Sequence, residues 1–178
     1  MQGLGANETL HFRKTTFWAQ LFLGVGVAVW GCLSFDCKLD LYVLDGNLTG
    51  QKYCDNVLSP RVVPNVDNYA LADRIMFMDD NARSHIARIV QYLLQQEAVK
   101  TSPRPAMSPD MNPIEHVWKF IGLKINQRNP KCQNIDELRT EILQEWQHFP
   151  QERFMRLVRS LTRRVTELHN KRGGYTRY

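Results

Sequence analysis

The sequence lacks the cysteine patterns of a disulfide scaffold or a zinc site. Its four cysteines, Cys32, Cys37, Cys54 and Cys132, are irregularly spaced, and no second pair of cysteines or histidines completes a set of zinc ligands. Internal repeats and low-complexity segments are also absent. These absences exclude a disulfide-rich secreted domain and a repeat array, and they indicate reduced thiols in an intracellular protein.

The chain is long enough for one domain with a substantial core. It has 178 residues, of which 43% are hydrophobic and 10% aromatic. This composition is ordinary for a globular protein, so extensive disorder is not expected.

Acidic residues are scarce in the last part of the chain. Residues 151–178 contain eight basic side chains and only two acids, an excess larger than the +5 of the whole chain. The basic residues are Arg153, Arg156, Arg159, Arg163, Arg164, Lys171, Arg172 and Arg177. The pattern is typical of either a solvated helix face or a surface that contacts phosphates.

A long uninterrupted hydrophobic run is missing as well. The apolar stretch of residues 17–33 follows Arg13 and Lys14, as in a signal peptide or a short membrane span, but Gln20 interrupts it. Five of its residues are tryptophan or glycine: Trp18, Gly24, Gly26, Trp30 and Gly31. We therefore expect no membrane segment here, and a secreted or membrane protein is the third of three hypotheses.

Short β-branched and apolar runs predict several strands. We expect strands at residues 25–35, 40–44 and 74–78, with a further short strand at 99–102. Residues 1–24 match no clear element. The first two strands are expected to form a hairpin, because Asp36-Cys37-Lys38 supplies turn residues between them.

Helical patterns fill most of the remaining chain. A helix is expected from Thr49 to about residue 58, with Pro60 and Pro64 interrupting it and residues 65–71 resuming it. Ser84 is the expected N-cap of the next helix. The apolar side of that helix would consist of Ile86, Ile89, Val90, Leu93 and Leu94.

The last three helices have clearer signals. Asn112-Pro113 predicts a helix start, with Trp118 among the core residues of that helix, and further helices are expected at residues 135–148 and 151–169. Strands that alternate with helices and then give way to helices predict an α/β layered domain with a helical C-terminus.

Two acidic motifs are the strongest functional signal. Met76-Phe77-Met78-Asp79-Asp80 is an apolar run that ends in acid, and Glu115 lies in the first turn of the helix that begins after Asn112. The two acids Asp80 and Glu115 are separated by 34 residues. Carboxylates from a strand end and a helix start can hold a divalent metal ion against a phosphate.

Each of these residues also has a purely structural interpretation. Asp80 with Asn81 is a common turn pair after a strand, and Glu115 can complete a capping box with Asn112. His85 lies five residues after Asp80, which suits either a phosphate contact or packing at a helix start. Asp79 and Asp110 are expected to be surface or turn residues.

The two motifs resemble a known family. The segments MDDNARSHIAR and SPDMNPIEHVW are similar to the catalytic core of the Tc/mariner superfamily of DNA transposases, and the similarity extends through VAVWGCLSF, YVLDG and NKRGGYTRY. It covers about residues 25–178. The resemblance implies an RNase H-like mixed sheet flanked by helices, with Asp80 as the second and Glu115 as the third acid of an Asp-Asp-Glu metal site.

The resemblance also implies cofactors and partners. In this family two Mg²⁺ or Mn²⁺ ions are clamped by three carboxylates and cut and join the phosphodiester backbone of DNA. We therefore expect a nuclear DNA-binding protein, with a homodimer as a further expectation. Phosphate contacts are expected from His85 and from the basic residues Arg153, Arg156, Arg163, Arg164, Lys171 and Arg172.

The chain departs from the family pattern at the first acid. That aspartate belongs on a strand before residues 27–35, but residues 1–24 contain Glu8 as their only acid. We therefore expect residues 1–24 to be a divergent segment, with residues 25–178 a catalytic domain truncated at its N-terminal strand and without helix-turn-helix modules. The aromatic pair Phe17-Trp18 could patch the exposed sheet edge.

Two functions follow from this departure. The first is a transposase catalytic domain that is inactive alone. The alternative is a non-catalytic domain, derived from a transposase, that binds nucleic acid or a partner protein through its basic last helix.

Overall fold

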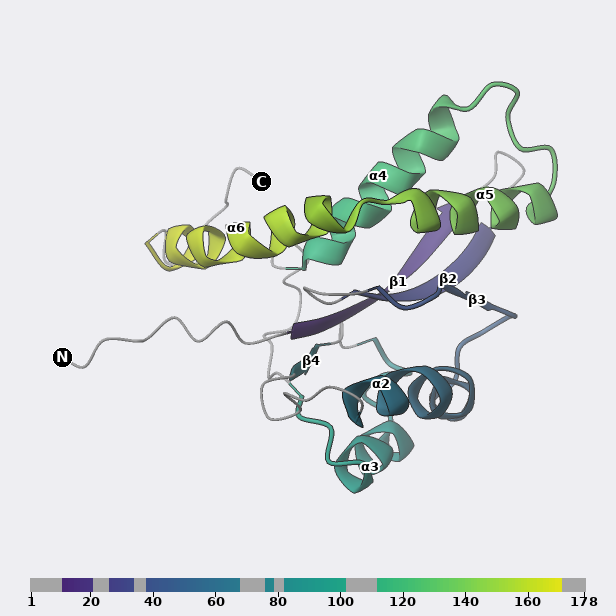
Figure 1. Cartoon of the computed structure of the whole chain (residues 1–178). Coiled ribbons are helices and arrows are strands. Elements are labelled where there is room, and N and C mark those ends of the chain that lie inside the picture. The colour runs from purple at the N-terminus through teal and green to yellow at the C-terminus, as the bar shows by residue number, and fades with distance from the viewer. Residues whose placement is uncertain are drawn as a thin grey trace.

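The protein forms three layers, with a mixed sheet between two groups of helices (Figure 1). The computed structural model describes residues 11–20, 26–33, 38–67, 76–78, 82–101 and 112–170. The sheet order is β3-β2-β1-β4. The last three helices cover one face of the sheet and the earlier helices cover the other (Figure 1). This mixed α/β arrangement agrees with the predicted fold class.

The predicted truncation of the sheet is wrong. Strand β1 (His11–Gln20) pairs antiparallel with β2 (Gly26–Leu33) and parallel with β4 (Met76–Met78). It therefore occupies an interior position of the sheet. The β-branched and aromatic run from Thr15 to Trp18 has high strand propensity, so the segment that was expected only to patch an edge provides a complete strand.

Strand β2 confirms the strand predicted at residues 25–35. Its side chains alternate between the two hydrophobic clusters of the protein: Val27, Val29 and Leu33 belong to one, and Trp30 and Cys32 to the other. Because both faces are covered, the strand is an almost continuous apolar run. Strand β3 (Tyr42–Leu44) pairs antiparallel with β2, as the predicted hairpin requires, and lies at one end of the strand order.

The expected strand at residues 99–102 is reduced to a single bridge. Thr101 pairs in parallel with Phe77, and the Phe77 amide donates a hydrogen bond of 2.7 Å to the Lys100 carbonyl oxygen. Phe77 thus pairs with a second neighbour besides β1, and its side chain is buried.

The helical segment after β3 continues through its prolines. Helix α1 (Gly50–Tyr53) leads directly into the π-helix η1 (Cys54–Val62) and then into α2 (Val63–Asp67). The prediction that Pro60 and Pro64 interrupt the helix is therefore wrong. The wider π-winding accommodates Pro60, and Pro64 lies just beyond it, as the second residue of α2. The Thr49 side chain caps α1, at the predicted start of the helix.

Helix α3 (Arg88–Gln96) begins later than the sequence predicted. Its N-cap is Ala87, which makes no side-chain cap hydrogen bond, so the expected Ser84 cap is wrong. The residues before Arg88 form turns. Val90 and Leu94 are buried, whereas Ile86 and Ile89 are 54% and 40% exposed. The later start leaves the two isoleucines outside the core-facing stripe.

The three C-terminal helices match their predictions. Helix α4 (Pro113–Gln127) begins at the predicted start, and α5 (Ile135–His148) and α6 (Gln151–Asn170) lie within one residue of their expected bounds. The Asn112 side chain accepts a hydrogen bond of 3.3 Å from the Ile114 amide, and Asn134 accepts one of 2.8 Å from the Glu137 amide. Strong caps explain why these helices begin where the sequence indicates.

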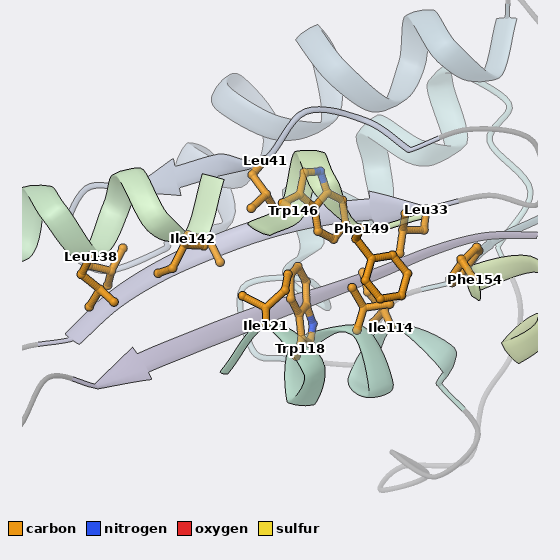
Figure 2. Packing of buried hydrophobic residues seen from close by; sticks show 13 residues of the cluster. Leu33, Leu41, Ile114, Trp118, Ile121, Leu138, Ile142, Trp146, Phe149 and Phe154 are labelled. Atoms are coloured by element: carbon orange, nitrogen blue, oxygen red, sulfur yellow. The ribbon is translucent and has the colours of Figure 1, made fainter. Parts of the chain in front are cut away.

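These helices and β2 enclose the larger hydrophobic cluster (Figure 2). Trp118 and Trp146 stack with their ring centroids 5.2 Å apart, and each is 2% exposed, which confirms Trp118 as a core residue. Gly31 faces them. A Cβ atom at Gly31 would lie 2.7 Å from Trp118 and 2.9 Å from Trp146, so the glycine permits their close approach to the sheet.

The loop between β2 and β3 is fastened to the end of α5. The Lys38 ammonium donates hydrogen bonds to the carbonyl oxygens of Trp146, Gln147 and Phe149, at 2.6, 2.6 and 3.0 Å. The Trp146 indole in turn donates to the Leu39 carbonyl at 2.9 Å. Burial lowers the pKa of Lys38, and the nearby Asp40 carboxylate opposes that shift. The contact satisfies carbonyls that a helix end leaves without partners.

Three cysteines lie in the described part of the chain, and all are free thiols. Cys32 and Cys54 are buried and Cys132 is half-buried. Within the same part of the chain, none of the helices combines the length and the apolar character that crossing a membrane requires.

Candidate metal centre

Glu115 is positioned by the start of α4. Its backbone amide donates a hydrogen bond of 3.1 Å to the Asn112 carbonyl oxygen, and its side chain is half-buried in the first turn. Ile114, next to it, is fully buried in the core, so the helix start cannot rotate freely. The Asn112 side chain caps the Ile114 amide. The reciprocal half of the capping box, from Glu115 back to Asn112, remains a prediction.

The second predicted ligand follows β4. This strand ends at Met78, and both Asp79 and Asp80 lie outside the described residues, as does Asp110. The three residues of β4 pair in parallel with His11, Phe12 and Arg13 of β1. The pairing of Asp80 with Glu115 as metal ligands therefore stays a prediction.

Strand β1 lies beside both supports of the candidate site. It is the parallel neighbour of β4, and α4 contacts it on one face of the sheet. The register places Arg13 of β1 beside Met78, the last residue of β4. The whole strand reads His-Phe-Arg-Lys-Thr-Thr-Phe-Trp-Ala-Gln and contains neither aspartate nor glutamate. The strand adjacent to the candidate ligands therefore contributes no carboxylate.

Whether two metal ions can bind at the candidate site depends on the side chains that are present as ligands. Mg²⁺ and Mn²⁺ prefer carboxylate oxygens, and a two-ion site needs a carboxylate that bridges both ions. Across residues 11–170, in the parts that are described, no three histidine, cysteine or acidic side chains gather into a metal-binding group. Asp80 and Glu115 with a β1 that has no acid do not fit the three-carboxylate clamp that the family resemblance implies.

His85 lies in the protein interior. It is fully buried, and its ring centroid is 4.6 Å from that of Tyr53. Its backbone amide donates to the Ala82 carbonyl at 2.8 Å, and its carbonyl accepts from the Gln91 side chain at 3.3 Å. This position favours packing near the start of α3 over contact with a phosphate.

The predicted basic residues of α6 are only partly described. Arg153 and Arg156 are exposed. The side chains of Arg163 and Arg164, and all of Lys171 and Arg172, lie outside the described set. The Arg153 guanidinium lies over the Phe120 ring of α4, 4.4 Å from its centroid. Sequence reasoning missed Lys124, which approaches the same ring at 5.8 Å. The signal was its spacing of four residues from Phe120.

Comparison with known proteins identifies the family. The profile of the DDE superfamily endonucleases matches residues 49–139, just over half of the chain. The Tc3 transposase of Caenorhabditis elegans is 27% identical over 157 residues, and the Tc1 transposase of the same species is 25% identical over 158. These alignments cover 88% and 87% of this chain but only 47% and 55% of the relatives. The chain thus spans about half the length of these transposases.

Solved structures agree with the fold. The catalytic domain of Mos1 mariner transposase superposes with a TM-score of 0.78 at 16% identity, covering 93% of this chain and 83% of that one. The same domain has been solved together with Raltegravir and either Mn or Mg. A Mos1 paired-end complex with the left transposon end gives a TM-score of 0.75 at 15% identity, with 93% and 55% coverage. The chain therefore belongs to the DDE superfamily endonucleases, with Tc/mariner transposases among its relatives.

Proposed function

We propose that this chain is a Tc/mariner-type transposase catalytic domain that does not cleave or join DNA on its own. The observation that carries the proposal is the sequence of β1. This strand lies next to β4 and against α4, where a carboxylate would complete the site, yet it has no acidic residue. The domain keeps the scaffold of the family while its metal site lacks one ligand.

The missing carboxylate matters because of what the metal ions do. When bound, they activate the attacking oxygen and stabilise the leaving oxygen of the phosphodiester. Asp80 and Glu115 are the residues that remain to hold Mg²⁺ or Mn²⁺ here, and the structures of the Mos1 catalytic domain with Mn or Mg support that choice of ions. Two carboxylates do not hold the ion pair that in-line displacement requires.

A nicking assay tests the proposal. Purified protein is incubated with supercoiled plasmid DNA and either Mg²⁺ or Mn²⁺, and the relaxed and linear forms are quantified. We expect no nicking above that of a sample containing EDTA. Metal-dependent nicking that disappears in both the Asp80→Ala and the Glu115→Gln variants would contradict the proposal, because it would show a working site built from these acids.

A second candidate function is duplex DNA binding without cleavage. The exposed arginines Arg153 and Arg156 of α6 favour it, and the related Mos1 structure with a transposon end supports DNA as the partner. Binding through phosphates releases counterions from the DNA. Because this release becomes less favourable as the salt concentration rises, such binding weakens steeply with salt. Fluorescence anisotropy with a labelled duplex at increasing NaCl concentration measures this dependence. Salt-insensitive binding would exclude the candidate.

Location and assembly complete the proposal. We propose a nuclear location because a DNA-binding function requires access to DNA, and fractionation of cells that express the tagged chain tests this proposal. A homodimer is the remaining expectation. Light scattering coupled to size-exclusion chromatography distinguishes a dimer from the 20.8 kDa monomer.

A further inference from the structure

Phe120 is a fixed aromatic platform at the junction of α4 and α6. Its ring packs edge-on against Phe149, with centroids 5.5 Å apart and an interplanar angle of 72°. Phe149 is itself only 3% exposed within the larger hydrophobic cluster. One side of the Phe120 ring is therefore held by the core, while the side chain remains half-buried at the surface.

Two cations from different helices lie over this one ring. The Arg153 guanidinium of α6 is 4.4 Å from the ring centroid, and the Lys124 ammonium of α4 is 5.8 Å from it. Both side chains are exposed. An aromatic ring attracts each cation through its negative face, so the ring gathers two like charges that would otherwise repel each other.

These cations have no acidic partner among the residues that are described. The ion pairs found there involve Arg128 with Glu141, and Arg139 with Asp45 and Asp136. The contrast with Arg139 is informative, because that arginine of α5 is neutralised by two carboxylates. The nearest acid on α6 is the exposed Glu152, whose backbone carbonyl accepts from Arg156 at 3.4 Å. Within the described part of the chain, no carboxylate pairs with Lys124 or Arg153, and an external anion could contact both.

We propose that Phe120, Lys124 and Arg153 form a phosphate-contacting platform for the backbone of duplex DNA, separate from the candidate metal centre. An exposed guanidinium whose central carbon lies 4.4 Å from a ring centroid still has N–H groups that can donate to phosphate oxygens. The exposed Arg156 extends the positive surface along α6. This arrangement on two helices suits a polymer with regularly spaced phosphates, and it rests on the proposed DNA-binding function.

The test compares two double variants of the full chain by anisotropy with a labelled DNA duplex over a range of NaCl concentrations. Lys124→Gln/Arg153→Gln removes the platform charges. Lys52→Gln/Arg139→Gln removes the same net charge from α1 and α5. We expect the platform variant to lower the magnitude of the salt slope by about 2, one for each phosphate contact, and the control to leave it unchanged. Equal slopes in the platform variant and the wild type would overturn the proposal.

A Phe120→Leu variant separates the platform from a merely basic surface. It keeps both charges and removes the ring that positions them, so we expect weaker DNA binding at an unchanged melting temperature. If the melting temperature falls, Phe120→Tyr, which retains the ring, should restore both stability and binding. Wild-type affinity in a stable Phe120→Leu variant would contradict the role of the ring.

The same assay also tests whether the platform is instead a site for a small anion, and whether the chain binds duplex DNA at all. Inorganic phosphate and chloride at matched ionic strength should displace the DNA equally. Selective displacement by phosphate would show a site for a small anion and overturn the proposal. If the wild type binds no duplex, the DNA-binding function and the platform both fail. If it binds but the platform variant behaves identically, only the platform fails.

Discussion

The helices on the two faces of the sheet differ in how regular they are and how they begin. On one face, α4, α5 and α6 follow regular helical periods, and side-chain caps start the first two. On the other, α1, η1 and α2 change winding in mid-course, and α3 starts without a side-chain cap. Both faces bury large side chains from β2, so apolar content does not distinguish them. The faces differ instead in their caps and helical spacing. Where these local signals are regular, the sequence predicts each helix correctly.

The larger cluster should dominate stability. Trp146 is 2% exposed, stacks on Trp118 and donates a hydrogen bond to Leu39. We expect Trp146→Ala to lower the free energy of unfolding by about 3–5 kcal/mol, because it leaves a cavity and a carbonyl without its donor. Urea denaturation followed by circular dichroism measures the change.

Trp146 and Trp30 are buried tryptophans on opposite faces of the sheet, so their substitutions can be compared directly. Trp30 is fully buried on the opposite face, and within the described residues its indole nitrogen has no hydrogen-bond partner. Trp146→Phe should therefore cost about 1 kcal/mol more than Trp30→Phe, because only the first loses a hydrogen bond. Equal costs in the same denaturation assay would show that the bond to Leu39 contributes nothing to the difference between the faces.

Lys38 joins the sheet to the regular helical face. Its ammonium serves three carbonyl oxygens near the end of α5, so Lys38→Met should destabilise the protein by about 1.5–3 kcal/mol at neutral pH. Thermal and urea denaturation of the two proteins give this difference. A Lys38→Met protein as stable as the wild type would show that water replaces the ammonium without cost.

The same lysine adds a pH dependence with a defined sign. Burial holds its pKa in the folded protein below the ordinary value of 10.5. Between these two values the unfolded chain binds more protons than the folded one, so this group makes the protein more stable as the pH rises through that window. Subtracting the curve of Lys38→Met from that of the wild type isolates the contribution. A difference that falls over the same window would contradict the lowered pKa.

The smallest effect is expected on the irregular face. Ile86 and Ile89 are 54% and 40% exposed, so changing either to serine should alter stability by no more than about 0.5 kcal/mol. Val90→Ser in α3 is the control, because Val90 is fully buried and its loss should be costly. A large loss in Ile86→Ser or Ile89→Ser would mean that the isoleucines pack as the sequence had predicted.

The sequence predicted the regular face almost completely. Asn112-Pro113 marks the start of α4, and the core residues of α4 and α5 repeat at helical spacing, so local chemistry alone defines them. Strand β2 was also predictable, because a continuous β-branched run indicates a strand buried on both faces.

The remaining features depend on tertiary context. Pro60 predicts a break in an α-helix, but here it lies in a π-helix. No local pattern in the sequence predicts that wider winding. Strand β1 lacks the acid that the family pattern predicts at this position, although Thr15 to Trp18 have the β-branched and aromatic side chains typical of a strand. At the candidate site, Glu115 was placed correctly at the start of α4, while Lys124 became visible only when α6 was seen against Phe120.

Binding of Mn²⁺ measured by isothermal titration calorimetry tests the central claim, that β1 leaves the metal site without one of its carboxylates. We predict at most one weakly bound ion per chain, lost in both the Asp80→Asn and the Glu115→Gln variants, because only these two carboxylates remain. Two tightly bound ions per chain would contradict the account. So would binding that neither substitution weakens.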